Sequence, residues 1–198
     1  MGAEAIACAL PLLLRHPGDG RNEGSEKARI LEMTLFPSDF TARAAALIER
    51  CRRNGLTLAT AESCTGGLIA GLLTSVSGSS DVLDCGFVTY SNGAKARMIG
   101  VPAELFARVG AVSEEVARAM AEGAMANSGA DLAVAVTGIA GPGGGSALKP
   151  VGLVYCAVTR RGRPTRTREL RLGDIGRDAV RLETVRVAVE MAYEIAGP

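Results

Sequence analysis

The stretch that decides the fold is LTLATAESCTGGLIAGLLTSV, residues 56–76. Its first five residues form a short apolar run that is typical of a buried strand. The segment AESCTGG, residues 61–67, then supplies the small and polar residues of a tight turn, and the apolar residues after it predict a helix to about residue 76. A strand that leads through a tight turn into a helix is the building unit of α/β proteins.

The segments on either side extend this unit into a domain. Upstream, an apolar face predicts a helix over 38–54, capped by Ser38 and ended by Gly55. Downstream, the patterns predict strands over 82–90 and 132–137, short helical pieces over 94–109, a helix capped by Ser113 over 113–127, a hairpin of strands 151–159 and 165–172, and a last helix over 178–196. Strands and helices alternate early and a hairpin comes late, so we expect a single three-layer α/β/α domain with a mixed sheet.

Length and composition permit one ordinary folded domain. Of the 198 residues 47% are hydrophobic, which excludes a disordered chain, and the net charge of +1 provides no field to hold a nucleic-acid backbone. Residues 1–32 lack a sustained pattern, so we expect a disordered leader or an over-extended start there, and the domain over residues 33–198. The apolar run at 5–14 is too short to span a bilayer, and we expect no membrane partner.

The cysteines and the histidine narrow the chemistry. Five widely spaced cysteines without a C-x-x-C pair fit neither a disulfide framework nor a zinc site, so we expect no metal, no cofactor and a reducing cytoplasm as the compartment. The single histidine, His16, lies in the N-terminal segment that lacks a pattern. A Ser-His-Asp or Cys-His catalytic device is therefore nearly excluded.

Ser63 is the first candidate nucleophile. It lies between a strand end and a helix start, and Gly66 and Gly67 after it would let a ligand approach free backbone amides. The alternative is that Ser63 or Thr65 simply caps the helix. Cys64 is more typical of a packed thiol, because no imidazole is present to generate a thiolate.

Glycines after the third strand offer a second set of amides at the same sheet edge, where open α/β sheets bind ligands. This segment, GIAGPGGG, covers residues 138–145 and includes Gly138, Gly141 and Gly143. Thr137 precedes it and could offer a hydroxyl to the same cleft. A flexible loop is the alternative interpretation.

Lys95 is the candidate base. The chain has three lysines against nineteen arginines, and arginine cannot act as a base, whereas a lysine with a lowered pKa can. Lys95 follows the second strand closely, with Tyr90 five residues before it, so serine, lysine and tyrosine could form a nucleophile set without histidine. The alternative for Lys95 is a solvated surface lysine. Arg177, before the last helix, could clamp a phosphate with its guanidinium, and the alternative is a solvated helix start.

Five motifs in order resemble the CinA C-terminal domain family, from about residue 38 to the C-terminus. They are AESCTGG (61–67), GFVTYSN (86–92) with Lys95 and MIGV (98–101), GAVS (110–113), TGIAGPGG (137–144) and KPVG (149–152). Gly93 departs from the family's pattern, in which another residue is usual, and this could loosen the turn that carries Lys95.

The resemblance implies an amidohydrolase that converts nicotinamide mononucleotide and water to nicotinate mononucleotide and ammonia in pyridine-nucleotide salvage. By similarity Ser63 is the nucleophile, Lys95 its proton acceptor and Tyr90 a helper, while Thr137 and Arg177 shape the substrate site. The two glycine turns would bind substrate through Thr65, Gly66, Gly67, Gly138, Gly141 and Gly143. The 37 residues before the match are too few for the additional domain of some members, so we expect the stand-alone form.

Two other functions stay open on sequence alone. One is a nucleotide-binding regulatory module without catalysis, linked to competence or the DNA-damage response. The other is a DNA-associated partner, which the near-zero net charge disfavours but the arginines of residues 160–171 keep open. A homo-oligomer is a further possibility, because an apolar-rich domain often leaves a patch to cover.

Overall fold

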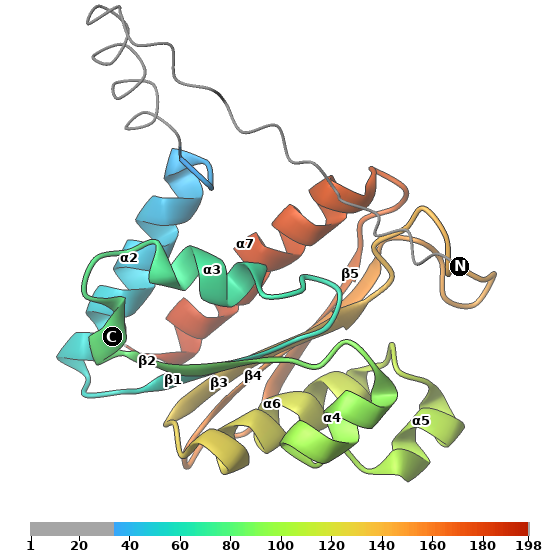
Figure 1. Cartoon of the computed structure of the whole chain (residues 1–198), viewed down its shortest axis with the longest axis horizontal. Helices are drawn as coiled ribbons and strands as arrows, with labels where there is room; N and C mark the ends of the chain where they lie inside the picture. Colours follow the sequence, from blue (N-terminus) through green and yellow to red (C-terminus); the bar gives the residue numbers. More distant parts are fainter. Residues whose placement is uncertain (1–33, 198) are drawn as a thin grey trace, which may run out of the picture. The chain divides into compact units, whose positions relative to one another are not determined.

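Five strands form one mixed sheet in the computed structural model, which describes residues 34–197 (Figure 1). The strand order is β2-β1-β3-β4-β5, with β1 (Leu58–Glu62), β2 (Leu83–Val88), β3 (Leu132–Gly138), β4 (Leu153–Arg160) and β5 (Arg166–Arg171). Strand β1 pairs in parallel with β2 and β3, and the late hairpin adds β4 and β5 in antiparallel register. The predicted mixed sheet is confirmed, whereas the leader predicted over 1–32 lies outside the described residues.

Helices cover both faces of the sheet, as Figure 1 shows. One layer consists of α2 (Ser38–Arg53), α3 (Leu68–Thr74) and α7 (Arg177–Ile195), and the other of α4 (Asn92–Ile99), α5 (Ala103–Val109) and α6 (Glu114–Ser128). A short 3₁₀ turn, Ser79–Asp81, precedes β2. The predicted three-layer α/β/α arrangement is therefore confirmed.

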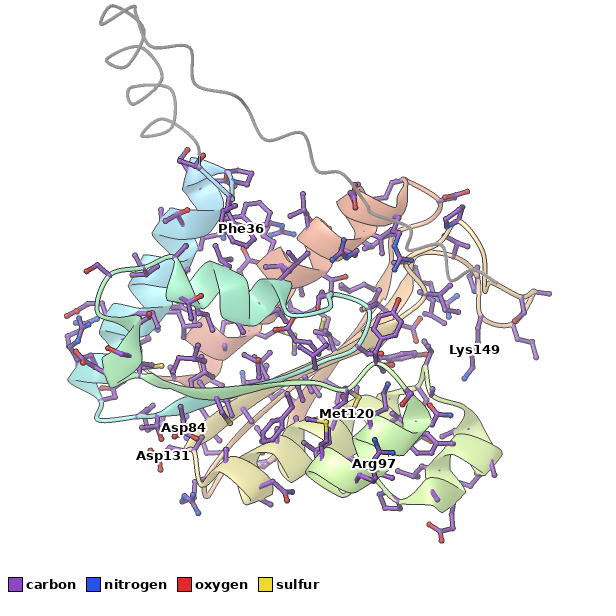
Figure 2. All side chains as sticks on the ribbon, viewed as in Figure 1. Phe36, Asp84, Arg97, Met120, Asp131 and Lys149 are labelled. Carbon is purple, nitrogen blue, oxygen red and sulfur yellow. The ribbon has the colours of Figure 1, made fainter. Side chains whose placement is uncertain are left out.

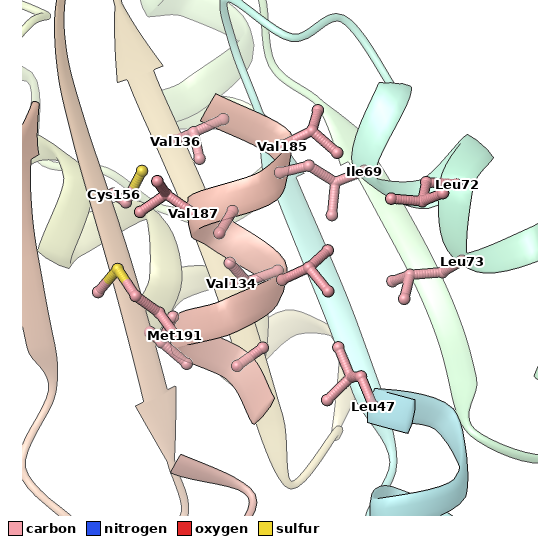
Figure 3. Packing of buried hydrophobic residues seen from close by; sticks show 14 of the residues in the cluster. Leu47, Ile69, Leu72, Leu73, Val134, Val136, Cys156, Val185, Val187 and Met191 are labelled. Atoms are coloured by element: carbon pink, nitrogen blue, oxygen red, sulfur yellow. The ribbon is translucent and has the colours of Figure 1, made fainter. Parts of the chain in front are cut away.

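Strand alternation divides the core between the two layers. Val134 and Val136 of β3 point to the side of α7 and pack near its Val187 and Met191 (Figure 3). Ala133 and Ala135 point to the other side, where Met120 of α6 lies beneath the sheet (Figure 2). Because alanines are small, α6 can lie close to the sheet on this face.

The connections that leave β1 and β2 run to opposite faces of the sheet. The chain leaves β1 through α3 toward β2 on one side, and returns from β2 through α4, α5 and α6 to β3 on the other. Open α/β sheets bind ligands where neighbouring connections diverge in this way, at the carboxyl ends of the strands. Lys149 lies at that end of the sheet, whereas Asp84 and Asp131 lie at the opposite end (Figure 2).

Two sequence predictions about element ends are wrong. Ser38 does not cap α2: it is the first helical residue, Pro37 holds the cap position, and no side-chain cap hydrogen bond forms. Strand β1 runs to Glu62 rather than ending at Thr60, because its last two residues pair with β2 on one side and with β3 on the other. The cap at Ser113 is confirmed, since its hydroxyl accepts from the Val116 amide.

A glycine contact fixes how closely α6 approaches α4. A Cβ atom added to Gly123 would lie 1.9 Å from the Ile99 carbonyl oxygen at the end of α4. We predict that Gly123→Ala lowers the free energy of unfolding by about 1–3 kcal/mol, the usual cost of an overpacked core, as measured by urea unfolding. The matched control is Gly93→Ala, where the added atom meets the flexible end of Arg97 at 3.2 Å and Ser91 Oγ at an ordinary contact distance of 3.9 Å. Because alanine favours helix, this control should be neutral or stabilising, and equal losses in both variants would contradict the prediction.

Candidate active site

Ser63 follows the last residue of β1 and begins a tight turn. Its amide donates to the Val136 carbonyl at 3.1 Å, so pairing with β3 continues one residue past the strand, and its own carbonyl accepts from the Gly66 amide at 3.1 Å. Gly66 and Gly67 have φ of 62° and 99°, values that favour glycine over residues with a side chain. The turn therefore holds Ser63 at the carboxyl edge of the sheet, where the connections from β1 and β2 diverge.

Lys95 of α4 reaches Ser63 from beneath this edge. Its side chain is 1% exposed, and its Nζ atom lies 3.0 Å from Ser63 Oγ, a hydrogen-bond distance. The same Nζ donates to the Thr89 carbonyl at 2.8 Å. The alternative of a solvated surface lysine is therefore wrong, and the structure brings the predicted nucleophile and base together.

Burial lowers the pKa of the Lys95 ammonium group below its ordinary value of 10.5. The physical cause is the loss of hydration, which disfavours the charged form, and the neighbouring Cys64 opposes this effect only in part. Burial raises the pKa of Cys64 to about 11, so its sulfur stays a neutral thiol near pH 7. Burial therefore shifts the pKa of Lys95 toward the range in which a base can act, whereas it shifts the pKa of Cys64 away from that range.

Glu62 was missed by the sequence analysis, and it caps α3. Gly67 holds the cap position without a side-chain bond, and the buried Glu62 carboxylate accepts the amides of Gly67, Ile69 and Ala70 at 2.9–3.1 Å. The helix-capping alternative for Ser63 and Thr65 is therefore wrong. No local sequence signal pointed to Glu62, because it precedes the cap residue Gly67 by five residues and the first turn of α3 contains no acidic residue.

A cavity of about 220 Å³ opens beside Ser63. It is bounded by the turn after β1, the segment after β2, the glycine-rich loop after β3 and the start of α7. The residues that line it are Ser63, Cys64, Tyr90, Gly138, Ile139, Ala140, Gly141, Gly143, Gly144 and Arg177. Most of the residues predicted for the site thus share one cavity, with Lys95 buried behind Ser63.

Arg177 links two walls of this cavity. It is the first residue of α7, and its guanidinium donates to the Gly141 carbonyl at 2.8 Å and to the Tyr90 hydroxyl at 3.0 Å. The side chain is therefore anchored at the cavity and is more than a solvated helix start. Tyr90 is 62% exposed, so its ring forms an accessible wall of the cavity.

Four residues predicted to bind substrate do not line the cavity. The buried Thr65 donates its hydroxyl to Glu62 at 2.6 Å, and Gly66 and Gly67 form the turn behind Ser63. Thr137 is buried and donates to the Ala111 carbonyl at 2.8 Å, which holds the loop before α6. Their contact with substrate stays a prediction.

Over residues 34–197, none of the helices has the length and apolar character needed to cross a bilayer. In the same range, the side chains of histidine, cysteine, aspartate and glutamate do not gather in any group of three or more that could hold a metal ion.

A family model of the CinA C-terminal domain matches residues 41–196. The chain belongs to this family. A crystal structure of the competence/damage inducible protein CihA from Agrobacterium tumefaciens is 54% identical and superposes with a TM-score of 0.82, covering 83% of this chain and 100% of that one. A family structure from Klebsiella pneumoniae is 34% identical with a TM-score of 0.75, covering 79% and 97% of the two chains.

Relatives of known sequence fall into two groups by length. The "CinA-like protein" of Myxococcus xanthus is 49% identical over 176 residues, which are 87% of this chain but 41% of that protein. The nicotinamide-nucleotide amidohydrolase PncC of Pseudomonas putida is 51% identical over 150 residues, 76% of this chain and 92% of that one. This chain therefore spans less than half of several longer relatives and nearly all of the shorter enzyme.

We predict that Lys95→Met removes a pH dependence of the free energy of unfolding. Because the pKa of Lys95 is lowered in the folded state, the unfolded chain binds more protons between that lowered pKa and 10.5, and wild-type stability rises with pH across this window. Methionine keeps an apolar side chain of similar length without the titration. Urea unfolding of both chains from about pH 7 to about pH 10 should give a wild-type minus variant difference that increases with pH. A constant difference would contradict the lowered pKa.

Proposed function

We propose that this chain hydrolyses the carboxamide of nicotinamide mononucleotide, giving nicotinate mononucleotide and ammonia. The observation that carries the proposal is the 3.0 Å contact between the buried Lys95 Nζ and Ser63 Oγ beside a cavity at the carboxyl edge of the sheet. The nicotinamide-nucleotide amidohydrolase of Pseudomonas putida, which this chain matches over most of its length, supports the same chemistry.

The reaction follows from the two side chains. Neutral Lys95 takes the proton of Ser63 as Oγ attacks the carboxamide carbon, and the resulting ammonium returns that proton to the nitrogen as ammonia leaves. Water then attacks the acyl-enzyme, with Lys95 again accepting a proton, and Ser63 is released with its hydroxyl restored. The lowered pKa of Lys95 supports this role, because an ordinary lysine is protonated near neutral pH.

The turn and the cavity supply candidates for the other roles. The Gly66 and Gly67 amides are already bonded to the Ser63 carbonyl and to Glu62, so we assign stabilisation of the oxyanion to the amide of Cys64, which lines the cavity. We assign the phosphate of the substrate to Arg177 and to the loop with Gly141 and Gly143, and Tyr90 to the wall beside Ser63 as a helper. Binding of the phosphate, which is remote from the carboxamide, would orient the carboxamide for attack by Ser63.

Other partners receive less support from the site. A regulatory module that binds a nucleotide without catalysis has no need of a buried lysine beside a serine. The arginines that kept a DNA-associated role open are partly engaged: Arg160 donates to the carbonyls of Ile195 and Ala196, and Arg161 to those of Gly129 and Ala130. A homo-oligomer stays a prediction.

A cytoplasmic location is part of the proposal. Cys51, Cys64, Cys85 and Cys156 are free thiols, which suits a reducing compartment.

We predict that Ser63→Ala abolishes ammonia release from nicotinamide mononucleotide, measured by a coupled ammonia assay. The variant lacks the nucleophile but removes one oxygen atom only, so it should fold, and circular dichroism checks this. Equal rates for both chains would contradict the role of Ser63. A folded wild-type chain that releases no ammonia would contradict the proposed activity and favour the binding module.

We predict that kcat/KM rises with pH through the lowered pKa of Lys95 and then levels off, over a range from about pH 6 to about pH 9. Lys95→Arg should be inactive across that range, because a guanidinium stays protonated. Single-turnover measurements check that chemistry limits the rate. A flat wild-type profile under that condition, or an active arginine variant, would contradict Lys95 as the base.

A further inference from the structure

The Glu62 carboxylate is fully buried, one residue before the proposed nucleophile. One oxygen, Oε2, accepts the Thr65 hydroxyl at 2.6 Å and the amides of Gly67 and Ile69 at 3.1 and 3.0 Å. The other, Oε1, accepts the Ala70 amide at 2.9 Å and the Thr60 hydroxyl at 3.3 Å. Five donors thus converge on one carboxylate that bridges the end of β1 and the start of α3.

Ser63 lies inside the loop that this carboxylate closes. The chain leaves β1 at Glu62, passes through Ser63 and returns to Glu62 at Thr65 and again at Gly67. Arg181 of α7 adds a bond to the Thr65 carbonyl at 3.1 Å from outside the loop. The position of Ser63 is therefore determined by contacts on both sides of it in the sequence.

Glu62 and Ser63 project to opposite faces of the sheet. Leu58 faces the same side of β1 as Glu62 and packs in the cluster with α2, α3 and α7. Ala59 and Ala61 face the other side and pack in the cluster with α6. Ser63 continues the second series and meets Lys95 of α4. Glu62 hence fixes the backbone of Ser63 from the face that carries α3, without lining the cavity. Thr65 contributes through the hydrogen bond that it donates to Glu62.

We infer that Glu62 and the Thr65 hydroxyl are positioning residues, which hold Ser63 Oγ at attacking distance from the substrate and from Lys95 Nζ. This inference rests on the proposed function, in which Ser63 is the nucleophile. The Thr65 hydroxyl makes the shortest of the five bonds and joins the loop itself, so it is the bond whose loss moves Ser63 most directly.

Thr65 and Thr60 provide a matched pair of variants. Both side chains are fully buried, and both donate a hydroxyl to the same carboxylate, but Thr60 lies within β1 and is not part of the loop around Ser63. Thr65→Val and Thr60→Val each remove one hydroxyl, retain the side-chain shape and leave Glu62 in place. A role in stability alone predicts similar effects for both.

A positioning role predicts different effects on the rate. Thr65→Val should lower kcat for nicotinamide mononucleotide by about tenfold with little change in KM, because a small displacement of a reacting atom is costly in the transition state. Thr60→Val should leave kcat unchanged although its Tm falls, and Thr65→Ser should restore kcat. The pH at which kcat/KM levels off should be the same in all four chains, since the environment of Lys95 is unaltered.

A fluorophosphonate gives a second readout that does not depend on the substrate. Ser63 Oγ bonds to phosphorus, fluoride leaves and Lys95 takes the serine proton, and the modification rate is followed by mass spectrometry. A wild-type chain that is modified but releases no ammonia would overturn the proposed function alone, and the variants would then be compared by this rate. Equal rates for the two valine variants, in whichever readout the wild type is active, would overturn the positioning role. A wild type inert in both would overturn it together with the nucleophile.

Discussion

The site depends on a lysine amine that the fold removes from water without pairing it with any carboxylate of residues 34–197. Lys95 Nζ meets a serine hydroxyl and a backbone carbonyl, two neutral partners that do little to offset the lost hydration of an ammonium ion. The neutral amine is therefore favoured more than in an exposed lysine. Burial of this amine costs stability, but it also lowers the pKa of Lys95, which a proton acceptor near neutral pH requires.

The architecture around this amine follows from the need to bring three elements together. Ser63 follows strand β1, Thr89 follows β2, and Lys95 comes from α4, whose end is pressed against Gly123 of α6. The small residues of the sheet on this face allow the close helix layer. Parallel pairing of β1 with β2 aligns their carboxyl ends, so residues 26 positions apart in the chain, Ser63 and Thr89, reach the same amine.

The sequence was informative where residue types are scarce and elements are regular. The single histidine lies in the N-terminal segment without a sequence pattern, and the chain has only three lysines, so Lys95 could be paired with Ser63 from the sequence alone. The alternation of strand and helix patterns predicted the mixed sheet. Contacts that depend on tertiary geometry were not accessible. Thr137 could be placed at a strand end, but its bond to Ala111 depends on a loop that no periodicity describes. The sequence pattern places Glu62 in a turn, because the pattern does not show the pairing with β2 and β3 that extends β1 to this residue.

Two buried ionisable groups, Glu62 at the end of β1 and Lys95 of α4, lie on opposite faces of the sheet, and the proposed chemistry requires that they stay apart. Had Glu62 projected to the same face as Ser63, its carboxylate would stabilise the Lys95 ammonium and raise the pKa that burial lowers. Strand alternation prevents this, since consecutive residues face opposite sides of the sheet. The five donors that surround Glu62 satisfy the carboxylate with hydroxyls and amides, so it can remain buried without a cation. The sheet thus separates the Glu62 carboxylate, which orders the turn, from the Lys95 amine, which we propose as the proton acceptor, and one peptide unit joins Glu62 to Ser63.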